Sequence, residues 1–163
     1  MFKSTSSIAR AGIIAGLYVA LTLIVFPIAS TEIQFRPSEG LTLLALVFPE
    51  AVPALFVGCV LSNFITGCQI LDVIFGGIVT LMAGGCTYLV GRIIKKTWLK
   101  ILIGGLFPVL LNALFLPLIW YYCYYQSNMV YYIQVISLTI SQSISVYAVG
   151  SPIIVLLQKR LKR

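Results

Sequence analysis

Long apolar runs, interrupted by only a few polar residues, dominate this chain. A transmembrane helix needs about 20 consecutive apolar residues, because the hydrocarbon core is about 30 Å thick and each helical residue adds about 1.5 Å. Runs of this length cover residues 8–29, 71–91, 101–124 and 130–157. A fifth apolar stretch, 40–64, is interrupted by Pro49, Glu50 and Pro53. The pattern therefore predicts four spanning helices and one segment whose form hydropathy alone leaves open.

The charged residues are segregated along the sequence. Ten of the eleven basic residues fall into three clusters, which are Lys3 and Arg10; Arg92, Lys95, Lys96 and Lys100; and Lys159, Arg160, Lys162 and Arg163. All four carboxylates, together with Arg36, lie between residues 32 and 72. Lys and Arg concentrate in short loops on the cytoplasmic side of membrane proteins. The clusters therefore predict that both termini and the 92–100 loop lie inside the cell.

This placement requires an even number of crossings before the 92–100 loop. A single helix over 40–64 would make that number odd, so we expect the stretch to break and to cross twice. Pro49 and Pro53 supply the break, because proline removes an amide donor and clashes with the preceding turn. Glu50 is then expected in the cytoplasmic bend, as a solvated turn residue or a partner contact. The six expected helices cover about 8–29, 39–48, 52–66, 71–92, 99–124 and 130–158.

The predicted fold class is thus an all-α membrane protein, with one integral domain over residues 1–163 and a bundle of six transmembrane helices. Alternation places the 30–38, 67–70 and 125–129 loops on the outer side. An aromatic cluster lands at this outer interface, where such residues form belts. Its members are Trp120, Tyr121, Tyr122, Tyr124, Tyr125, Tyr131 and Tyr132. Trp98 is expected at the inner interface.

Composition supports a location in the cell membrane. Hydrophobic residues make up 60% of the chain, charged residues 9%, and the mean hydropathy is +1.06. This leaves too little polar surface for a water-soluble globule of this length. The net charge of +7 does not indicate nucleic acid, because the cations flank apolar runs, where anionic headgroups and orientation explain them. The first apolar run is too long for a signal peptide and lacks a processing site, so it is interpreted as a transmembrane helix.

Most catalytic and metal chemistry is excluded by what the sequence lacks. It has no histidine, and its four cysteines form no CxxC pair, so we expect neither a zinc site nor another metal. There is no P-loop, no Ser-His or Cys-His combination, and no helix with paired carboxylates. We therefore expect that the chain is not an enzyme and holds no cofactor. A proton relay is also hard to build, so any transport would draw its energy from another subunit.

Polar residues in apolar helices are costly, so their positions indicate where function lies. Six of them are expected to converge on a small, polar, flat solute in a cavity that opens outward, namely Arg36, Glu39, Asn63, Asp72, Asn112 and Gln142. Glu32 and Gln134 lie toward the same side. Asn112 and Gln142 are deepest, near the bilayer midplane, and could instead serve as interhelical hydrogen-bonding groups.

The first-loop residues also have structural alternatives. Arg36 and Glu39 are three residues apart and could form an ion pair in the loop, with Ser38 capping the second helix. Asp72 opens a helix and could merely interact favourably with the helix dipole. The sequence leaves these alternatives open beside direct contact with a ligand.

Small residues form a ridge along the first helix. Ala11 and Ala15, with the neighbouring Gly12, Gly16 and Ala20, make overlapping small-xxx-small pairs. Such a ridge permits close helix approach, either within this chain or to a partner.

Several segments spread over nearly the whole chain share a recognisable pattern. They are AGIIAGLYVA at 11–20, IQFRPSE at 33–39 with the following LTLL, 49–63, DVIFG at 72–76, 112–113, and VYAVGSP at 146–152. With these residues the chain resembles the QueT family of queuosine-precursor transporters. The segment around Arg36 and Glu39 is the most specific part, whereas the small-residue motif is generic.

This resemblance implies the substrate-binding S-component of an energy-coupling factor (ECF) transporter. Such a subunit has six helices and captures a micronutrient outside the cell. It works with a transmembrane coupling subunit and two cytoplasmic ATPase subunits, which use the ATP. The resemblance maps the docking face for the coupling subunit onto Ala11 and Ala15. The implied cargo is a 7-deazaguanine such as preQ1, or queuine, with Glu39 or Asp72 accepting its adjacent N–H groups.

The last helix departs from the family pattern. Family members carry a Gly-Glu pair where this chain has Ser141 and Gln142. An amide offers a donor and an acceptor, but it does not neutralise the aminomethyl cation of preQ1, so the choice among deazaguanines stays open. The alternatives are an S-component for another vitamin-like solute, an assembly subunit without a ligand, and a self-sufficient secondary carrier.

Overall fold

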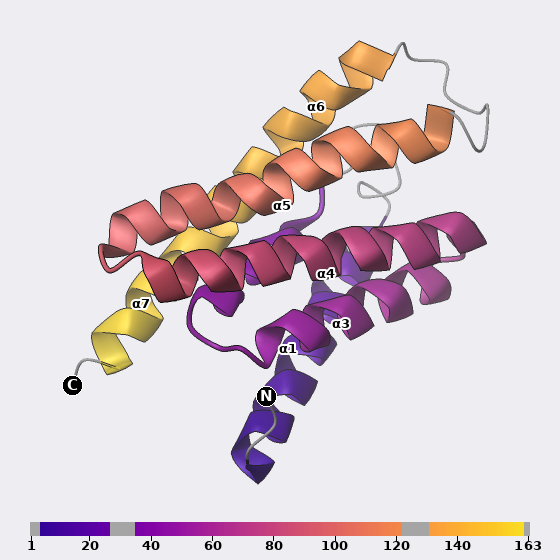
Figure 1. The fold of residues 1–163 in the computed structure, drawn as a ribbon. Coiled ribbons are helices and arrows are strands. Elements are labelled where there is room, and N and C mark those ends of the chain that lie inside the picture. The colour runs from indigo at the N-terminus through magenta and orange to yellow at the C-terminus, as the bar shows by residue number, and fades with distance from the viewer. Residues whose placement is uncertain (1–3, 27–34, 122–130, 162–163) are drawn as a thin grey trace.

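The computed structural model describes residues 4–26, 35–121 and 131–161, and these residues form an all-helical bundle (Figure 1). In chain order its elements are α1 (Thr5–Ile24), η1 (Pro37–Leu46), α3 (Ala51–Ile65), α4 (Ile70–Ile93), α5 (Thr97–Ile119), α6 (Tyr131–Ser143), η3 (Ile144–Gly150) and α7 (Ser151–Leu161). The predicted helical fold class is confirmed, and the bounds differ from the expected ones by a few residues. The largest differences are at the ends of α1, at Ile24 rather than near residue 29, and of α5, at Ile119 rather than near residue 124; both expected ends lie outside the described residues.

Four helical stretches are long and apolar enough to cross a membrane. They are α1, α4, α5 and the continuous run of α6, η3 and α7 over Tyr131–Arg160. Neighbours in the chain pack side by side, since α1 lies against α3, α3 against α4, α4 against α5, and α5 against α6 (Figure 1). Among the described residues, α3 and η1 are shorter than a full span.

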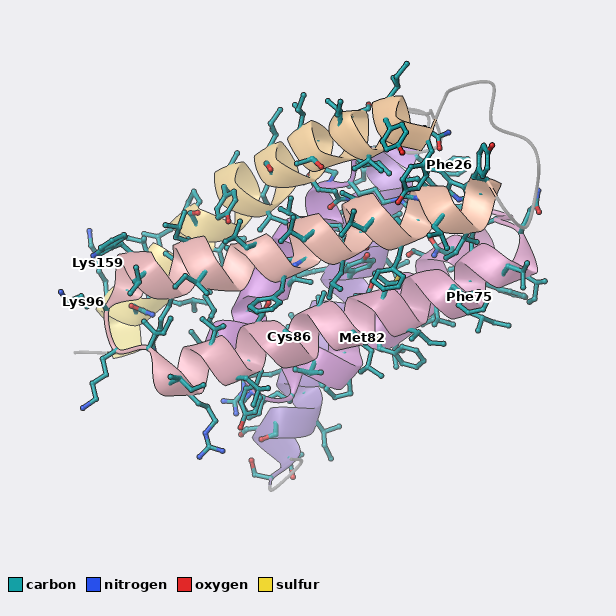
Figure 2. All side chains as sticks on the ribbon, turned by 45° about the horizontal axis from the view of Figure 1, so that its top comes forward. Phe26, Phe75, Met82, Cys86, Lys96 and Lys159 are labelled. Atoms are coloured by element: carbon teal, nitrogen blue, oxygen red, sulfur yellow. The ribbon has the colours of Figure 1, made fainter. Side chains whose placement is uncertain are left out.

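The outer surface of the bundle is apolar, as contact with lipid requires. On α5, a leucine stands at every fourth position from Leu102 to Leu118, and each is 43–48% exposed. A stripe of this kind would be buried in a water-soluble protein. Side chains such as Phe75 and Met82 of α4 lie on the outside in the same way (Figure 2). The chain is therefore a membrane protein.

The segment η1 is a 3₁₀ helix enclosed by the other helices. The sequence predicted a short second helix over 39–48, ending at a bend near Pro49, and the bend is confirmed. The helix type was not foreseen. Ser38–Leu46 are all buried, and η1 contacts α1, α3, α4, α5, η3 and α7. A 3₁₀ helix rises about 2.0 Å per residue, so its ten residues extend about 20 Å instead of about 15 Å. The extra rise and the protein surroundings explain how so short a segment fits inside the bundle.

Glycines allow neighbours to approach both ends of η1 closely. A Cβ added at Gly150 of η3 would collide with the carbonyl oxygen of Gly40. A Cβ added at Gly91 of α4 would lie 2.5 Å from the carbonyl oxygen of Leu46. Because no side chain other than hydrogen fits at Gly150 or Gly91, these residues fix the position of η1 at each end.

The last helical stretch contains a π-helical segment, η3, where one continuous helix was expected over about 130–158. Its Ser145 carbonyl faces Gly40, since a Cβ added at Gly40 would lie 2.7 Å from that oxygen. Pro152 follows directly and has no amide to donate to the preceding turn. The wider π turn thus stands where the helix meets η1 most closely, and segments of this kind are frequent at functional sites.

Basic residues gather at one end of the bundle. Lys96 and Lys159 lie together there (Figure 2), and the Thr97 hydroxyl donates to the Gln158 side-chain oxygen between α5 and α7. Trp98 is 63% exposed at this end. At the opposite end, Trp120, Tyr121, Tyr131 and Tyr132 belong to the predicted aromatic cluster. The other members, Tyr122, Tyr124 and Tyr125, lie outside the described residues.

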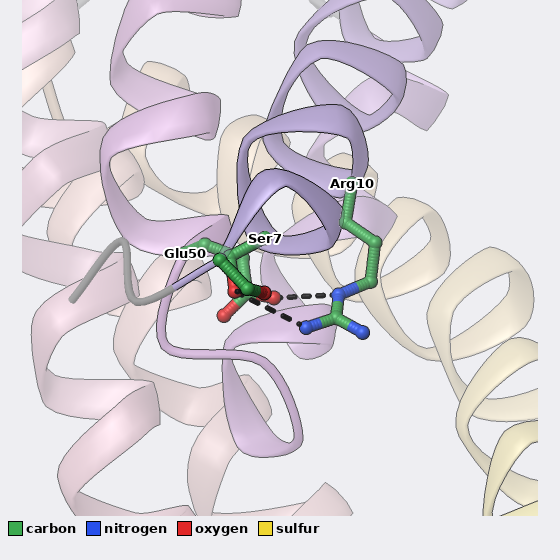
Figure 3. Close-up of polar contacts among 4 residues, drawn as sticks. Ser7, Arg10 and Glu50 are labelled. Carbon is green, nitrogen blue, oxygen red and sulfur yellow. Dashed lines mark hydrogen bonds and ion pairs between the residues drawn. The ribbon is translucent and has the colours of Figure 1, made fainter.

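Glu50 lies in the bend as predicted, but the alternative that it is a solvated turn residue was wrong. Its side chain is 3% exposed and is no solvated turn residue, because the Arg10 Nε donates to its Oε1 at 2.6 Å (Figure 3). The Arg10 Nη2 also donates to the Ser7 hydroxyl at 3.4 Å, and the guanidinium lies 5.2 Å from the centroid of the Phe48 ring. The ion pair ties α1 to the bend after η1, and sequence reasoning missed it because the two residues are 40 positions apart.

Candidate functional site

A buried carboxylate lies at the centre of the candidate site. Glu39 stands in the first turn of η1 and is 2% exposed. The Tyr18 hydroxyl of α1 donates to its Oε1 at 2.5 Å, and the Asn112 amide of α5 donates to its Oε2 at 3.2 Å. Tyr18 is fully buried because its side chain packs on Gly58 of α3, where an added Cβ would lie 2.8 Å from the Tyr18 Cβ. Side chains from three elements therefore meet at Glu39.

The partners of Glu39 are neutral groups. Within the described part of the chain, no Lys or Arg nitrogen lies within 4.0 Å of its carboxylate. An ionised carboxylate has about four acceptor positions, and hydrogen bonds from other described residues use two of them. The site thus offers a negative group that is held in place and can still accept hydrogen bonds from an N–H donor or a cation.

Hydroxyl groups beside Glu39 bond α1 to η1 and bond to the Glu39 backbone. Thr22 of α1 donates to the Ser38 hydroxyl at 2.8 Å and is also within 2.9 Å of the Tyr18 carbonyl oxygen. The Thr42 hydroxyl donates to the carbonyl oxygen of Glu39. Ser38 therefore joins α1 to η1 and does not cap η1, so that structural alternative was wrong.

A second polar chain lies at the end of the bundle opposite the lysines. The Arg36 Nη1 donates to the Asn63 Oδ1 at 3.1 Å, and the Asn63 Nδ2 lies 3.2 Å from the backbone oxygen of Asp72. The Trp120 indole donates to the Asp72 Oδ1 at 2.9 Å. Arg36 contacts α3 and forms no ion pair with Glu39, so the expected loop ion pair is also absent between these two described residues.

Two glutamines on α6 are buried without enough partners. Gln142 is 1% exposed, and neither its Oε1 nor its Nε2 has a hydrogen-bond partner among the described residues. The Oε1 of Gln134, which is 2% exposed, and the Nε of Arg36 also have no partner within this part of the chain. Each such buried polar atom costs about 1–3 kcal/mol when it is left unpaired. These atoms are therefore set up to bind something that carries its own donors and acceptors.

Gln142, on α6, lies just before η3, and η3 packs against η1, which bears Glu39. Gln142 lies one helical turn before Ser145, whose carbonyl faces Gly40, the residue next to Glu39. Gln134, Leu138 and Gln142 are all buried and recur about every four residues, so they share the inward face of α6.

The six residues selected from the sequence thus fall into three groups. Glu39 and Asn112 are bonded directly, Arg36, Asn63 and Asp72 form the second chain, and Gln142 bonds to none of the others. Glu32 lies outside the described residues.

Sequence reasoning missed Tyr18, which donates the shorter of the two hydrogen bonds to the Glu39 carboxylate. A signal was present, because a tyrosine in the middle of an apolar helix needs a partner for its hydroxyl. Trp120 was interpreted only as an interfacial residue, although its indole N–H contacts Asp72.

The small residues of α1 divide into two sets. Ala11 and Ala15 are partly buried and pack against the core. Gly12 and Gly16 are exposed, and a Cβ added at either would meet no atom within 4 Å. The open part of the small-residue ridge is therefore the glycine side.

Comparison with known proteins gives a consistent result. The sequence model of the QueT transporter family matches residues 8–159, which is nearly the whole chain. The queuosine precursor transporter QueT of Lactococcus lactis subsp. cremoris (strain MG1363) is 39% identical over 82 residues. That alignment spans about half of each protein, 49% of this chain and 48% of the relative. No solved structure matches the chain significantly.

Proposed function

Because this chain belongs to the QueT transporter family, a family of transporters and not of enzymes, we propose that it captures a queuosine precursor outside the cell for import. The ligand class is a 7-deazaguanine such as preQ1, or queuine. In this proposal the chain is the S-component of an ECF transporter, and separate ATPase subunits supply the energy. The observation that carries the ligand site is the buried Gln142 amide, whose two polar atoms have no partner among the described residues and which lies just before η3, the segment that packs on η1 and faces the residue next to Glu39.

The chemistry of the ligand suits the groups around Glu39. The guanine-like edge of a deazaguanine presents two adjacent N–H donors and a carbonyl acceptor. The Glu39 carboxylate has acceptor positions left after Tyr18 and Asn112 have bonded, so it can accept from both N–H groups. The Gln142 Nε2 can donate to the carbonyl, and its Oε1 can accept from a further donor. Occupation would thus remove the unpaired polar atoms that the free protein buries.

The charge of the site does not rank the deazaguanines by itself. The last helix carries the neutral Gln142, so it offers no carboxylate to a ligand cation. The primary alkylamine of preQ1 and the secondary alkylamine of queuine are both cations at neutral pH. We therefore expect charge alone to favour neither ligand over the other.

The proposed membrane topology has six crossings and both termini in the cytoplasm. Support comes from Lys96 and Lys159, which lie together at one end (Figure 2), and from the Arg36–Asn63–Asp72 chain at the other. Segregation of cations to one end is the pattern that positive-inside orientation produces. In this orientation the Glu39 site is reached from outside.

The partner surface in this proposal is the small-residue ridge of α1, with Ala11 and Ala15 at its edge. Gly16→Leu adds a large side chain into open space, so folding and ligand binding should persist. We expect co-purification with the coupling subunit to be lost, as also for Ala11→Leu. Normal assembly of both variants would refute docking on this face.

Ligand binding itself is tested by a thermal-shift comparison of the purified protein with preQ1, queuine, guanine and an unrelated vitamin. Tight binding raises the unfolding midpoint by mass action. We expect a shift with deazaguanines only. Equal shifts with the vitamin, or none with any compound, would contradict the proposed ligand class.

The role of Gln142 has its own test. Gln142→Leu removes both unpaired amide atoms, so the free protein should become about 1–3 kcal/mol more stable while deazaguanine affinity falls about tenfold. Ser143→Ala, one position further along α6, is the matched control and should keep normal affinity. A Gln142→Leu protein that is less stable and still binds normally would show that the amide serves only the fold.

A further inference from the structure

The basic end of the bundle contains a pocket that the capture of a solute does not use. It has a volume of about 580 Å³ and is lined by Ser7, Arg10, Val47, Phe48, Pro49, Glu50, Tyr88 and Arg92. It lies between the first turns of α1, the bend after η1 and the last turns of α4. The Glu39 site is bounded by other residues, so the two sites are separate.

The charges in this pocket leave a cation without a partner. Arg10 already pairs with Glu50 and with the Ser7 hydroxyl (Figure 3), and the Arg10–Glu50 pair is electrically neutral. Arg92 is exposed, and no Asp or Glu oxygen within the described residues lies within 4.0 Å of its guanidinium. The pocket therefore has an excess positive charge on a planar group that suits phosphate oxygens.

The other walls of the pocket are mixed in character. Val47, Phe48 and Pro49 give it an apolar side, while Ser7 and Tyr88 add hydroxyl groups. Its volume is within the range of sites that hold small organic groups. A guest with an anionic head and an apolar remainder matches such walls better than a free ion does.

We propose that this pocket binds the headgroup of an anionic phospholipid, with Arg92 holding the phosphate and the apolar wall contacting the glycerol region. The other cations at this end, such as Lys96 and Lys159 (Figure 2), place it at the level where headgroups lie, and basic pockets between helices bind such lipids. A bound lipid would join α1 to α4 beside the Arg10–Glu50 pair. This assignment does not depend on the ligand proposed for the Glu39 site.

The experiment measures lipid binding to the purified full chain by native mass spectrometry and by thermal shift. The probes are phosphatidylglycerol, phosphatidylcholine and inorganic phosphate. We expect phosphatidylglycerol to bind and stabilise, phosphatidylcholine to do neither, and phosphate alone to give no shift. Arg92→Gln should weaken phosphatidylglycerol about tenfold. The matched control Lys95→Gln removes the same charge three positions away, outside the pocket, and should change affinity by less than about twofold.

Several results would overturn the assignment. Equal weakening by Arg92→Gln and Lys95→Gln would show attraction to net charge and not to a pocket. A shift with phosphate as large as with phosphatidylglycerol would assign the pocket to free phosphate compounds. Unchanged lipid binding by Arg92→Gln, with lost co-purification of a coupling subunit, would make the pocket a protein contact instead.

Discussion

Glu39, in the first turn of η1, and Glu50, in the bend between η1 and α3, differ in how their charges are held. Both residues are 2% exposed. Glu39 accepts hydrogen bonds from a tyrosine hydroxyl and an asparagine amide, whereas Glu50 is bound by the guanidinium of Arg10. The ion pair neutralises the Glu50 carboxylate, so a ligand would gain little binding energy from contacting it. A carboxylate held by neutral donors keeps its charge available, so equal burial does not imply an equal role.

The sharpest test of this comparison is Glu39→Gln beside Glu50→Gln. The first change removes the negative acceptor for the ligand N–H groups, and hydrogen bonds to charged groups contribute about 1.5–3 kcal/mol each. We expect deazaguanine affinity, measured by titration calorimetry, to fall at least about 100-fold while the fold persists. Glu50→Gln should stay within about twofold of the parent. Similar losses in both variants would erase the distinction between the two carboxylates.

Arg10→Gln tests whether the ion pair with Glu50 stabilises the fold. It leaves the buried Glu50 carboxylate without its cation, which in a fully buried pair costs about 3–5 kcal/mol. Arg10 is itself 46% exposed, so water offsets part of that loss and we expect about 2 kcal/mol. The loss should appear as a lower unfolding midpoint in detergent, with ligand affinity unchanged.

The double variant Arg10→Gln/Glu50→Gln is the control for that experiment. Because it removes both charges, it should recover most of the lost stability. If the double variant is no more stable than Arg10→Gln alone, the ion pair is not what ties α1 to the bend.

The smallest expected effect is that of Tyr18→Phe. The ring keeps its packing on Gly58, but one donor to the Glu39 carboxylate is lost. A neutral group that orients the acceptor should contribute about 1 kcal/mol, so calorimetry should show about fivefold weaker ligand binding. A loss as large as that of Glu39→Gln would mean that Tyr18 itself contacts the ligand.

Much of the architecture could be predicted from local features of the chain. Hydropathy located the helices because burial in lipid acts on each residue separately. Pro49 and Pro53 located the bend. The cation clusters predicted it, because they imply an even number of membrane crossings before the 92–100 loop. The 3₁₀ form of η1 could not be predicted, because it depends on the close approach of Gly150 and Gly91 from distant parts of the chain.

The candidate site was predictable to a lesser degree. Scarce polar residues in apolar helices identified Glu39, Asn112 and Gln142 as a group to expect near one another. The sequence did not indicate that Tyr18 would bond to Glu39, or that Arg36 would contact Asn63 instead of Glu39. These contacts depend on how helices rotate against one another, and residue spacing within a helix does not determine that rotation.

The sequence by itself determined that this is an all-helical membrane protein with ten of its eleven cations in three clusters and its carboxylates in one segment, because hydropathy and charge are properties of single residues. Only the tertiary structure decided which buried carboxylate is neutralised, because Arg10, 40 residues away, pairs with Glu50, whereas no Lys or Arg nitrogen of the described residues lies within 4.0 Å of the Glu39 carboxylate. The energy of a buried charge depends on the groups packed around it, and packing brings these together from separate helices.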